Sequence, residues 1–120
     1  MRKLLSTVMT VMMLCGVSIA GLQEESYDYW QVQRQMVRQG QQAVFMCNGL
    51  FTSNRTLELV FQQELAFLPD PIGTAQGGDY EVDYERKGVV IGSGQDAPKM
   101  RAAFRDGIGC VILPPDQTLA

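Results

Sequence analysis

The chain has 120 residues, of which 13 are acidic and 10 basic, and it contains no histidine. A formal net charge of −3, with the basic residues scattered, argues against nucleic-acid binding, because a phosphate backbone attracts the opposite balance. The lack of histidine excludes a Ser-His-Asp triad and a Cys-His pair, which both need an imidazole base. We expect one small domain without a cofactor or a metal.

Residues 1–20 have the pattern of a secretory signal peptide. A short basic start precedes an almost wholly apolar run at residues 4–17, and a small-x-small site follows. We therefore expect cleavage between Ala20 and Gly21 and export to the periplasm or out of the cell. If the signal stays uncleaved, residues 4–20 would anchor the chain in a membrane, which is the only membrane contact that we expect.

The cysteines predict a disulfide. Cys15 leaves with the signal, so Cys47 and Cys110 remain in an exported chain, where an even number suggests a bond. This bond would close a loop of about 64 residues and contribute on the order of 4 kcal/mol in the chain-entropy model. A zinc site and a cysteine nucleophile are poor alternatives, because both would need ligands or a base that histidine usually provides.

A first helix is predicted at residues 26–39. Its apolar side chains recur at helical spacing, and Gly40 supplies a C-terminal stop. The residues predicted to face inward are Tyr29, Trp30, Val32, Met36 and Val37.

A second helix is predicted from about Thr56 to Leu68, ended by Pro69. Asn54-Arg55-Thr56 also matches an N-glycosylation acceptor, but good N-cap residues before an apolar run favour a helix start. The residues predicted to face inward are Leu57, Val60, Phe61, Leu65 and Leu68.

Residues 79–85 alternate between acidic and apolar side chains, which predicts a half-buried strand, and a turn leads to a second strand at residues 89–91. The four carboxylates do not form an EF-hand calcium loop, because Tyr84 and Val90 occupy the positions that need glycine and glutamate. We interpret the acidic side as solvated.

The stretch "VVIGSGQDA" allows two interpretations. Gly92-x-Gly94-x-x-Ala97 after a strand matches the dinucleotide fingerprint, and Asp116 follows at roughly the spacing of a ribose-binding carboxylate. Residues 88–116 would then form a βαβ unit. Export, Pro98 in the first helical turn and room for a single unit count against it. The alternative is a meander, with a loop at residues 92–99 and a strand at residues 100–105.

Two stretches resemble a known family. "MCNGLFTSNRTLELVFQQEL" is similar to the C-S-G-x-F-x-S-G-R segment near the N-terminus of exported bacterial serine hydrolases of the β-lactamase-related family. "GGDYEVDYERKGVVIG" followed by "MRAAFRDGIGCVILPPDQT" resembles the strand-turn-strand and G-x-G-C segment that comes next there. The resemblance covers residues 27–119 and departs from the family at Asn48 and Asn54.

This resemblance implies an α+β fold with two N-terminal helices and a small antiparallel meander, and so disfavours the dinucleotide site. It implies that residues 21–120 are the N-terminal part of a larger serine β-lactamase-like fold, and that the chain is a fragment. The complete protein would cleave a small-molecule amide or ester through an acyl-serine. Its S-x-x-K nucleophile would lie beyond this chain, so no catalytic residue falls within it. The alternative is a small exported single-disulfide domain that binds a partner without catalysis.

Overall fold

The computed structural model describes residues 30–92 and 98–119. Its longest helix is α2 (Gln31–Cys47), which runs directly into the π-helical turn η1 (Asn48–Thr52). A second helical segment follows as three short turns: α3 (Leu57–Leu59), η2 (Val60–Glu64) and η3 (Leu65–Phe67). The strands are β1 (Tyr80–Asp83), β2 (Gly88–Ile91), β3 (Met100–Arg105) and β4 (Gly109–Leu113). The expected signal segment at residues 1–20 and the Ala20–Gly21 cleavage site lie outside the described residues.

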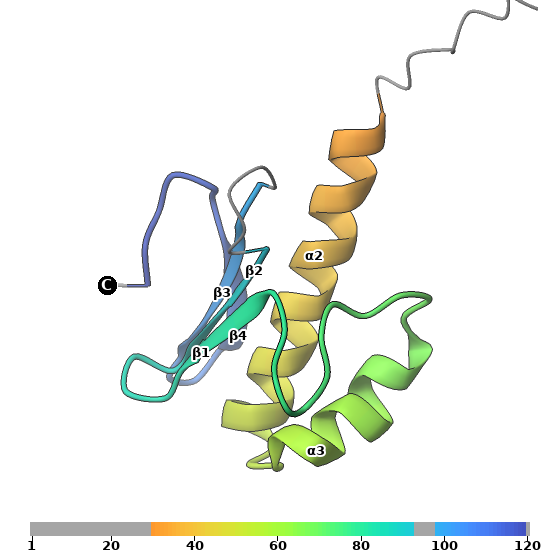
Figure 1. Cartoon of the computed structure of the whole chain (residues 1–120). Helices are drawn as coiled ribbons and strands as arrows, with labels where there is room; N and C mark the ends of the chain where they lie inside the picture. Colours follow the sequence, from red (N-terminus) through yellow and green to blue (C-terminus); the bar gives the residue numbers. More distant parts are fainter. Residues whose placement is uncertain (1–29, 93–97, 120) are drawn as a thin grey trace, which may run out of the picture.

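The strands form one antiparallel sheet in the order β1-β2-β3-β4. Helix α2 lies across one face of this sheet, and its C-terminal end meets the α3 segment (Figure 1). The predicted α+β fold, with helices before an antiparallel meander, is confirmed for the described residues.

The predicted meander, with a strand at residues 100–105, is confirmed, and the alternative of a dinucleotide-binding βαβ unit at residues 88–116 is wrong. Residues 100–105 form β3, not a helix, and β3 pairs antiparallel with β2 in the register Ile91↔Met100. A βαβ unit needs parallel strands joined by a crossover helix, whereas β2 and β3 are antiparallel neighbours. Gly94 and Ala97 of the fingerprint lie outside the described residues, while Asp116 is exposed in a turn after β4.

The predicted end of the first helix is also wrong, since α2 continues through Gly40 to Cys47. Gly40 is buried, and a Cβ atom there would lie only 3.2 Å from the Met100 Cε atom on β3. The glycine therefore permits a close approach of the helix to the sheet. Burial of the turns that follow stabilises the helix more than one interior glycine destabilises it.

The predicted inward face of this helix is not the buried one. Trp30, Val32 and Val37 are exposed, Met36 is half-buried, and Tyr29 lies outside the described residues. The side chains that enter the core belong to the second half of α2, from Gln39 onward, and include Ala43, Met46 and Cys47. Only this half packs between the sheet and the helical segment that follows.

The second helical segment begins as predicted. Thr56 is the N-cap, and its hydroxyl oxygen accepts a hydrogen bond from the Leu59 N–H at 3.3 Å. The predicted apolar face is confirmed, because Val60 and Leu65 are fully buried and Leu57, Phe61 and Leu68 pack around them. The segment is not one regular α-helix: three α-helical residues are followed by a π-helical and a 3₁₀ turn.

A buried glutamine joins α2 to the loop before the sheet. The Gln42 Nε2 group donates to the Ile72 carbonyl at 2.8 Å, and the Ile72 N–H donates to Gln42 Oε1 at 2.7 Å. The side-chain amide thus pairs both backbone groups of Ile72. Because unpaired backbone groups are costly when they are shielded from water, this contact holds the loop against the helix.

Candidate functional site

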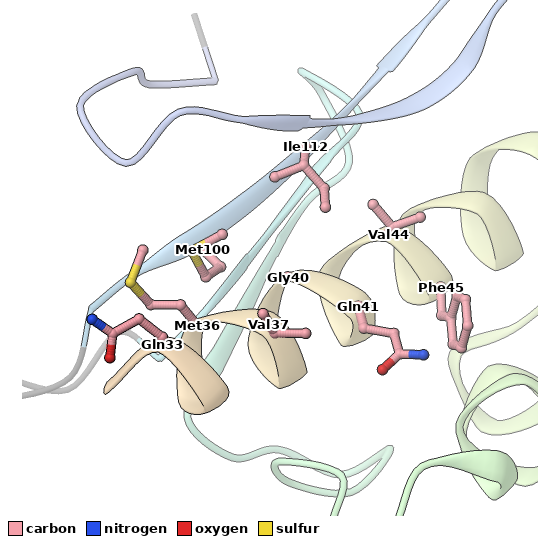
Figure 2. A pocket seen from close by; sticks show the side chains of 9 residues that line it. All are labelled: Gln33, Met36, Val37, Gly40, Gln41, Val44, Phe45, Met100 and Ile112. Carbon is pink, nitrogen blue, oxygen red and sulfur yellow. The ribbon is translucent and has the colours of Figure 1, made fainter. Parts of the chain in front are cut away.

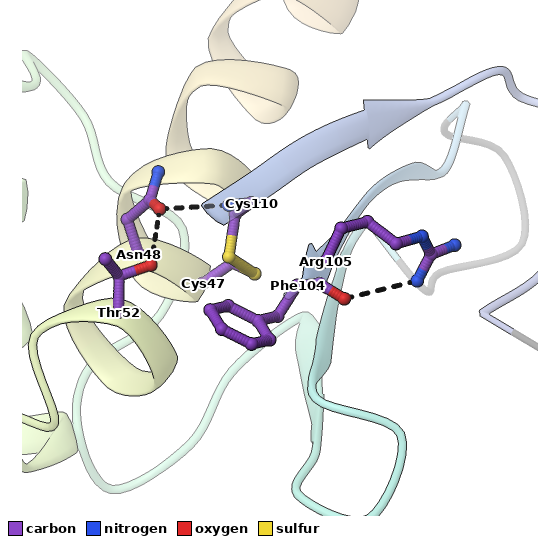
Figure 3. Close-up of a disulfide and its surroundings, with 6 residues drawn as sticks. All are labelled: Cys47, Asn48, Thr52, Phe104, Arg105 and Cys110. Atoms are coloured by element: carbon purple, nitrogen blue, oxygen red, sulfur yellow. Dashed lines mark hydrogen bonds between the residues drawn. A yellow bond between two sulfur atoms is a disulfide. The ribbon is translucent and has the colours of Figure 1, made fainter. Parts of the chain in front are cut away.

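The disulfide joins the end of α2 to the start of β4. Cys47 and Cys110 are bonded, with their Cα atoms 5.9 Å apart, so the predicted disulfide is confirmed (Figure 3). The Asn48 Oδ1 atom accepts hydrogen bonds from the Cys110 N–H at 3.1 Å and from the Thr52 hydroxyl at 2.8 Å. Both thiols are consumed by the bond, and the role of this junction is structural.

No reactive serine is assembled in the described part of the chain. Ser53 is exposed at the end of η1, and no hydrogen bond links it to Lys87 or Lys99. The Lys87 ammonium group instead lies 5.1 Å from the centre of the Phe104 ring. Ser26 and Ser93 lie outside the described residues.

Metal and membrane features are also missing from residues 30–92 and 98–119. No three histidine, cysteine, aspartate or glutamate side chains gather there in a way that could hold a metal ion. None of the helices within those ranges is long and apolar enough to cross a bilayer.

Two titratable groups on the β1 side have shifted pKa values with structural causes. Hydrogen bonds from the Arg86 backbone N–H and then from its guanidinium hold the pKa of Asp83 below its usual value. Burial, and then the neighbouring Tyr84, raise the pKa of Tyr80, whose hydroxyl donates to the Thr74 carbonyl at 2.6 Å. Each group is engaged by its own turn or loop, so neither is poised for acid–base chemistry.

An open apolar groove of about 700 Å³ lies between α2 and the strands β3 and β4 (Figure 2). We call it the α2–β4 groove. Its apolar lining comes from Met36, Val37, Val44 and Phe45 of α2, Met100 of β3 and Ile112 of β4. Gln33, Gln41 and Gly40 complete it, and none of the described residues that line it is charged. Ile112 is 49% exposed although it lies on the helix-facing side of the sheet.

The outer edge of β4 borders this groove. In an antiparallel strand, successive residues direct their N–H and C=O groups alternately to one neighbour and to the other. The Cys110 N–H leaves the sheet to reach Asn48, so the backbone groups of Ile112, two residues on, also point outward. None of the described strands pairs with β4 on that side.

Sequence reasoning missed the groove although a signal for it was present. Met36 and Val37, which were predicted to face the core, line the groove instead. Gln42 was missed altogether, because a glutamine within a helix has no pattern that predicts burial.

No protein-family model, no curated protein and no solved structure matches the chain. The resemblance to β-lactamase-related hydrolases therefore rests on the two sequence segments quoted above.

Proposed function

We propose that this chain is the N-terminal, non-catalytic part of an exported serine hydrolase that cleaves a small-molecule amide or ester through an acyl-serine. The observation that supports this best is the meeting of the two segments that carry the resemblance. Cys47 of the first segment is bonded to Cys110 of the second, and the neighbouring Asn48 binds the Cys110 N–H. The chain would supply a disulfide-braced helix and sheet as scaffold.

The nucleophile and its base would come from residues beyond Ala120. Serine acylation needs a nucleophile, a base within hydrogen-bond reach, and donors that stabilise the oxyanion. In the described residues, Ser53 has no lysine partner, and the two cysteine sulfurs are bonded to each other. The 120-residue chain should therefore have no hydrolase activity of its own.

The test compares the 120-residue chain with a version extended by translation of the downstream DNA. We expect an S-x-x-K motif within roughly the next hundred residues. The extended protein should take a fluorophosphonate or penicillin label and hydrolyse nitrocefin or a p-nitrophenyl ester. Replacement of the serine of that motif with alanine is the control and should abolish labelling.

The short chain should show neither labelling nor turnover above background. Stoichiometric labelling at Ser26, Ser53 or Ser93 of the short chain would contradict the proposal, because the site would then lie within it. A reading frame without S-x-x-K would contradict it as well.

The second candidate is a self-contained exported domain that binds a partner and catalyses nothing. The α2–β4 groove and the open edge of β4 favour it, because a cavity with apolar walls next to an unpaired strand is a common form of protein-binding surface. A lack of S-x-x-K downstream, together with binding through the groove, would decide for this function.

A further inference from the structure

We propose that Gln39 holds a buried water molecule, which joins helix α2 to the loop at residues 68–72. The site lies three residues before Gln42, whose side chain binds the same loop directly. The inference goes beyond the hydrolase proposal and does not rest on it, because all the groups that it uses belong to the described core.

Gln39 is a buried polar side chain without a protein partner. Its residue is only 2% exposed, and its Oε1 atom accepts no hydrogen bond from the described part of the chain. A buried acceptor costs free energy unless some group donates a hydrogen bond to it. Buried water molecules commonly supply this hydrogen bond in globular proteins.

The end of β2 leaves room for the Gln39 amide inside the molecule. Gly92 directly follows β2 with a φ of +73°, which favours glycine, and its N–H donates to the Asp79 carbonyl at 2.9 Å. A Cβ atom at Gly92 would lie 3.1 Å from Gln39 Nε2 and 3.2 Å from Gln39 Oε1. Because glycine has no such atom, the amide can lie against the strand end and stay buried.

Gln39 also lines a narrow cavity of about 30 Å³ between α2 and the loop. The loop side of this cavity is formed by Leu68, Pro69, Asp70 and Ile72. A water molecule needs about 10 to 15 Å³ of accessible volume. The cavity therefore has room for one or two water molecules beside the amide.

The loop offers acceptors rather than donors to such a water. Pro69 and Pro71 have no N–H group, and the Ile72 N–H already donates to Gln42. Within the described chain, no hydrogen bond reaches the carbonyl groups of residues 68–70. A water molecule has two hydrogens to donate, so it can bridge the Gln39 carbonyl to one of these loop carbonyls.

Other occupants fit this cavity less well than water. An anion needs donors, whereas the groups without partners on the two sides are acceptors. Calcium needs six to eight oxygen ligands, and Asp70 is the single carboxylate among the described residues that line the cavity. An organic ligand needs a volume of several hundred Å³, roughly ten times what is present.

The test observes the water in the full 120-residue chain with its disulfide formed. A high-resolution crystal structure should show an ordered water within about 3 Å of Gln39 Oε1. In solution, NOE spectroscopy should show a long-lived contact between water and the side-chain amides of Gln39 and Gln42, which both line the cavity. None of the described lining residues has a hydroxyl group whose exchange with solvent could imitate this contact.

Two matched substitutions test whether Gln39 holds the water. Gln39→Met removes the amide but keeps a side chain of similar length, so both the ordered water and its NOE to Gln42 should be lost. Gln35→Met makes the same change in the exposed half of α2 and should keep both signals. The Ile72 amide should stay protected from hydrogen exchange in Gln39→Met, because Gln42 accepts that hydrogen bond. This protection separates loss of the water from a general loosening of the loop.

Three results would overturn the proposal. The first is a wild-type structure in which no water lies on Gln39 Oε1, and the second is one in which a protein group donates to that atom. The third is a Gln39→Met variant that keeps the water and its NOE to Gln42. The wild-type measurements decide even if a variant fails to fold. None of these results depends on serine labelling, so failure here and failure of the hydrolase proposal are separate outcomes.

Discussion

Both halves of α2 present apolar side chains on a helical stripe, but only the second half buries them. From Gln39 to Cys47 the helix packs between the sheet and the segment from α3 to η3, and the disulfide fixes its end. From Gln31 to Arg38 the side chains are exposed apart from half-buried Met36. Helical periodicity therefore identifies which residues share a face, whereas burial depends on whether another part of the molecule reaches that face.

The largest expected effect concerns the buried half. Replacement of both Cys47 and Cys110 with serine should lower the free energy of unfolding by about 4 kcal/mol, because the bond constrains a long loop of the unfolded chain. Their separation of 63 positions makes this loop more than half of the chain. Urea denaturation measures the change, and the reduced wild type should match the variant. A decrease in the free energy of unfolding of less than about 1 kcal/mol would mean that packing alone stabilises the buried half of α2.

A pair of core and surface truncations tests the contrast directly. Met46→Ala should cost about 3 kcal/mol, since this fully buried side chain leaves a cavity. Val37→Ala in the exposed half should change the free energy of unfolding by less than about 0.5 kcal/mol. Both values are to be measured by denaturation at low micromolar concentration. Equal costs at the two positions would contradict the division of α2 into two halves.

A pair of glutamines extends the comparison to polar side chains. Gln42→Leu removes both hydrogen bonds to Ile72 and should cost about 2 kcal/mol, because the Ile72 N–H and C=O lose their partners. Gln35→Leu is the matched substitution in the exposed half and should be nearly neutral. Hydrogen exchange at the Ile72 amide should rise in the first variant only. If that amide stays protected, Gln42 does not hold the loop.

The smallest expected effect is that of pH. Helix α2 contains no acidic residue and the chain contains no histidine. The difference in unfolding free energy between Met46→Ala and Val37→Ala should therefore not vary from about pH 5 to 8.

The pKa of Asp83 is lowered in the folded state, chiefly by the Arg86 backbone N–H. Its stabilisation is thus present above the unfolded pKa of about 3.9 and is lost as pH falls through the lower folded value.

Denaturation at pH 3, 4 and 7 measures this change, and Asp83→Asn is the control. The wild type should lose a small amount of stability below about pH 4 that the variant does not lose. A pH-dependent difference between the two α2 variants would mean that an ionisable group outside α2 contacts one of its halves.

Much of the sheet was predictable from the sequence, because strand signals are local. The alternation at residues 79–85 places Tyr80 and Val82 on one side, and tight turns then make antiparallel pairing the simplest arrangement. The N-cap at Thr56 follows from its side-chain chemistry. The disulfide was predicted from the two cysteines that remain once the expected signal segment is set aside.

Tertiary structure alone decided the end of α2, its buried side and the α2–β4 groove. The helix continues past Gly40, which packs against Met100 of β3, a residue far away in the sequence. The buried side depends on where the sheet and the α3 segment lie, and Gln42 is buried because the Ile72 backbone is there to bind it. Local sequence patterns do not predict these long-range contacts, because the free energy of burial arises only when the second surface is in place.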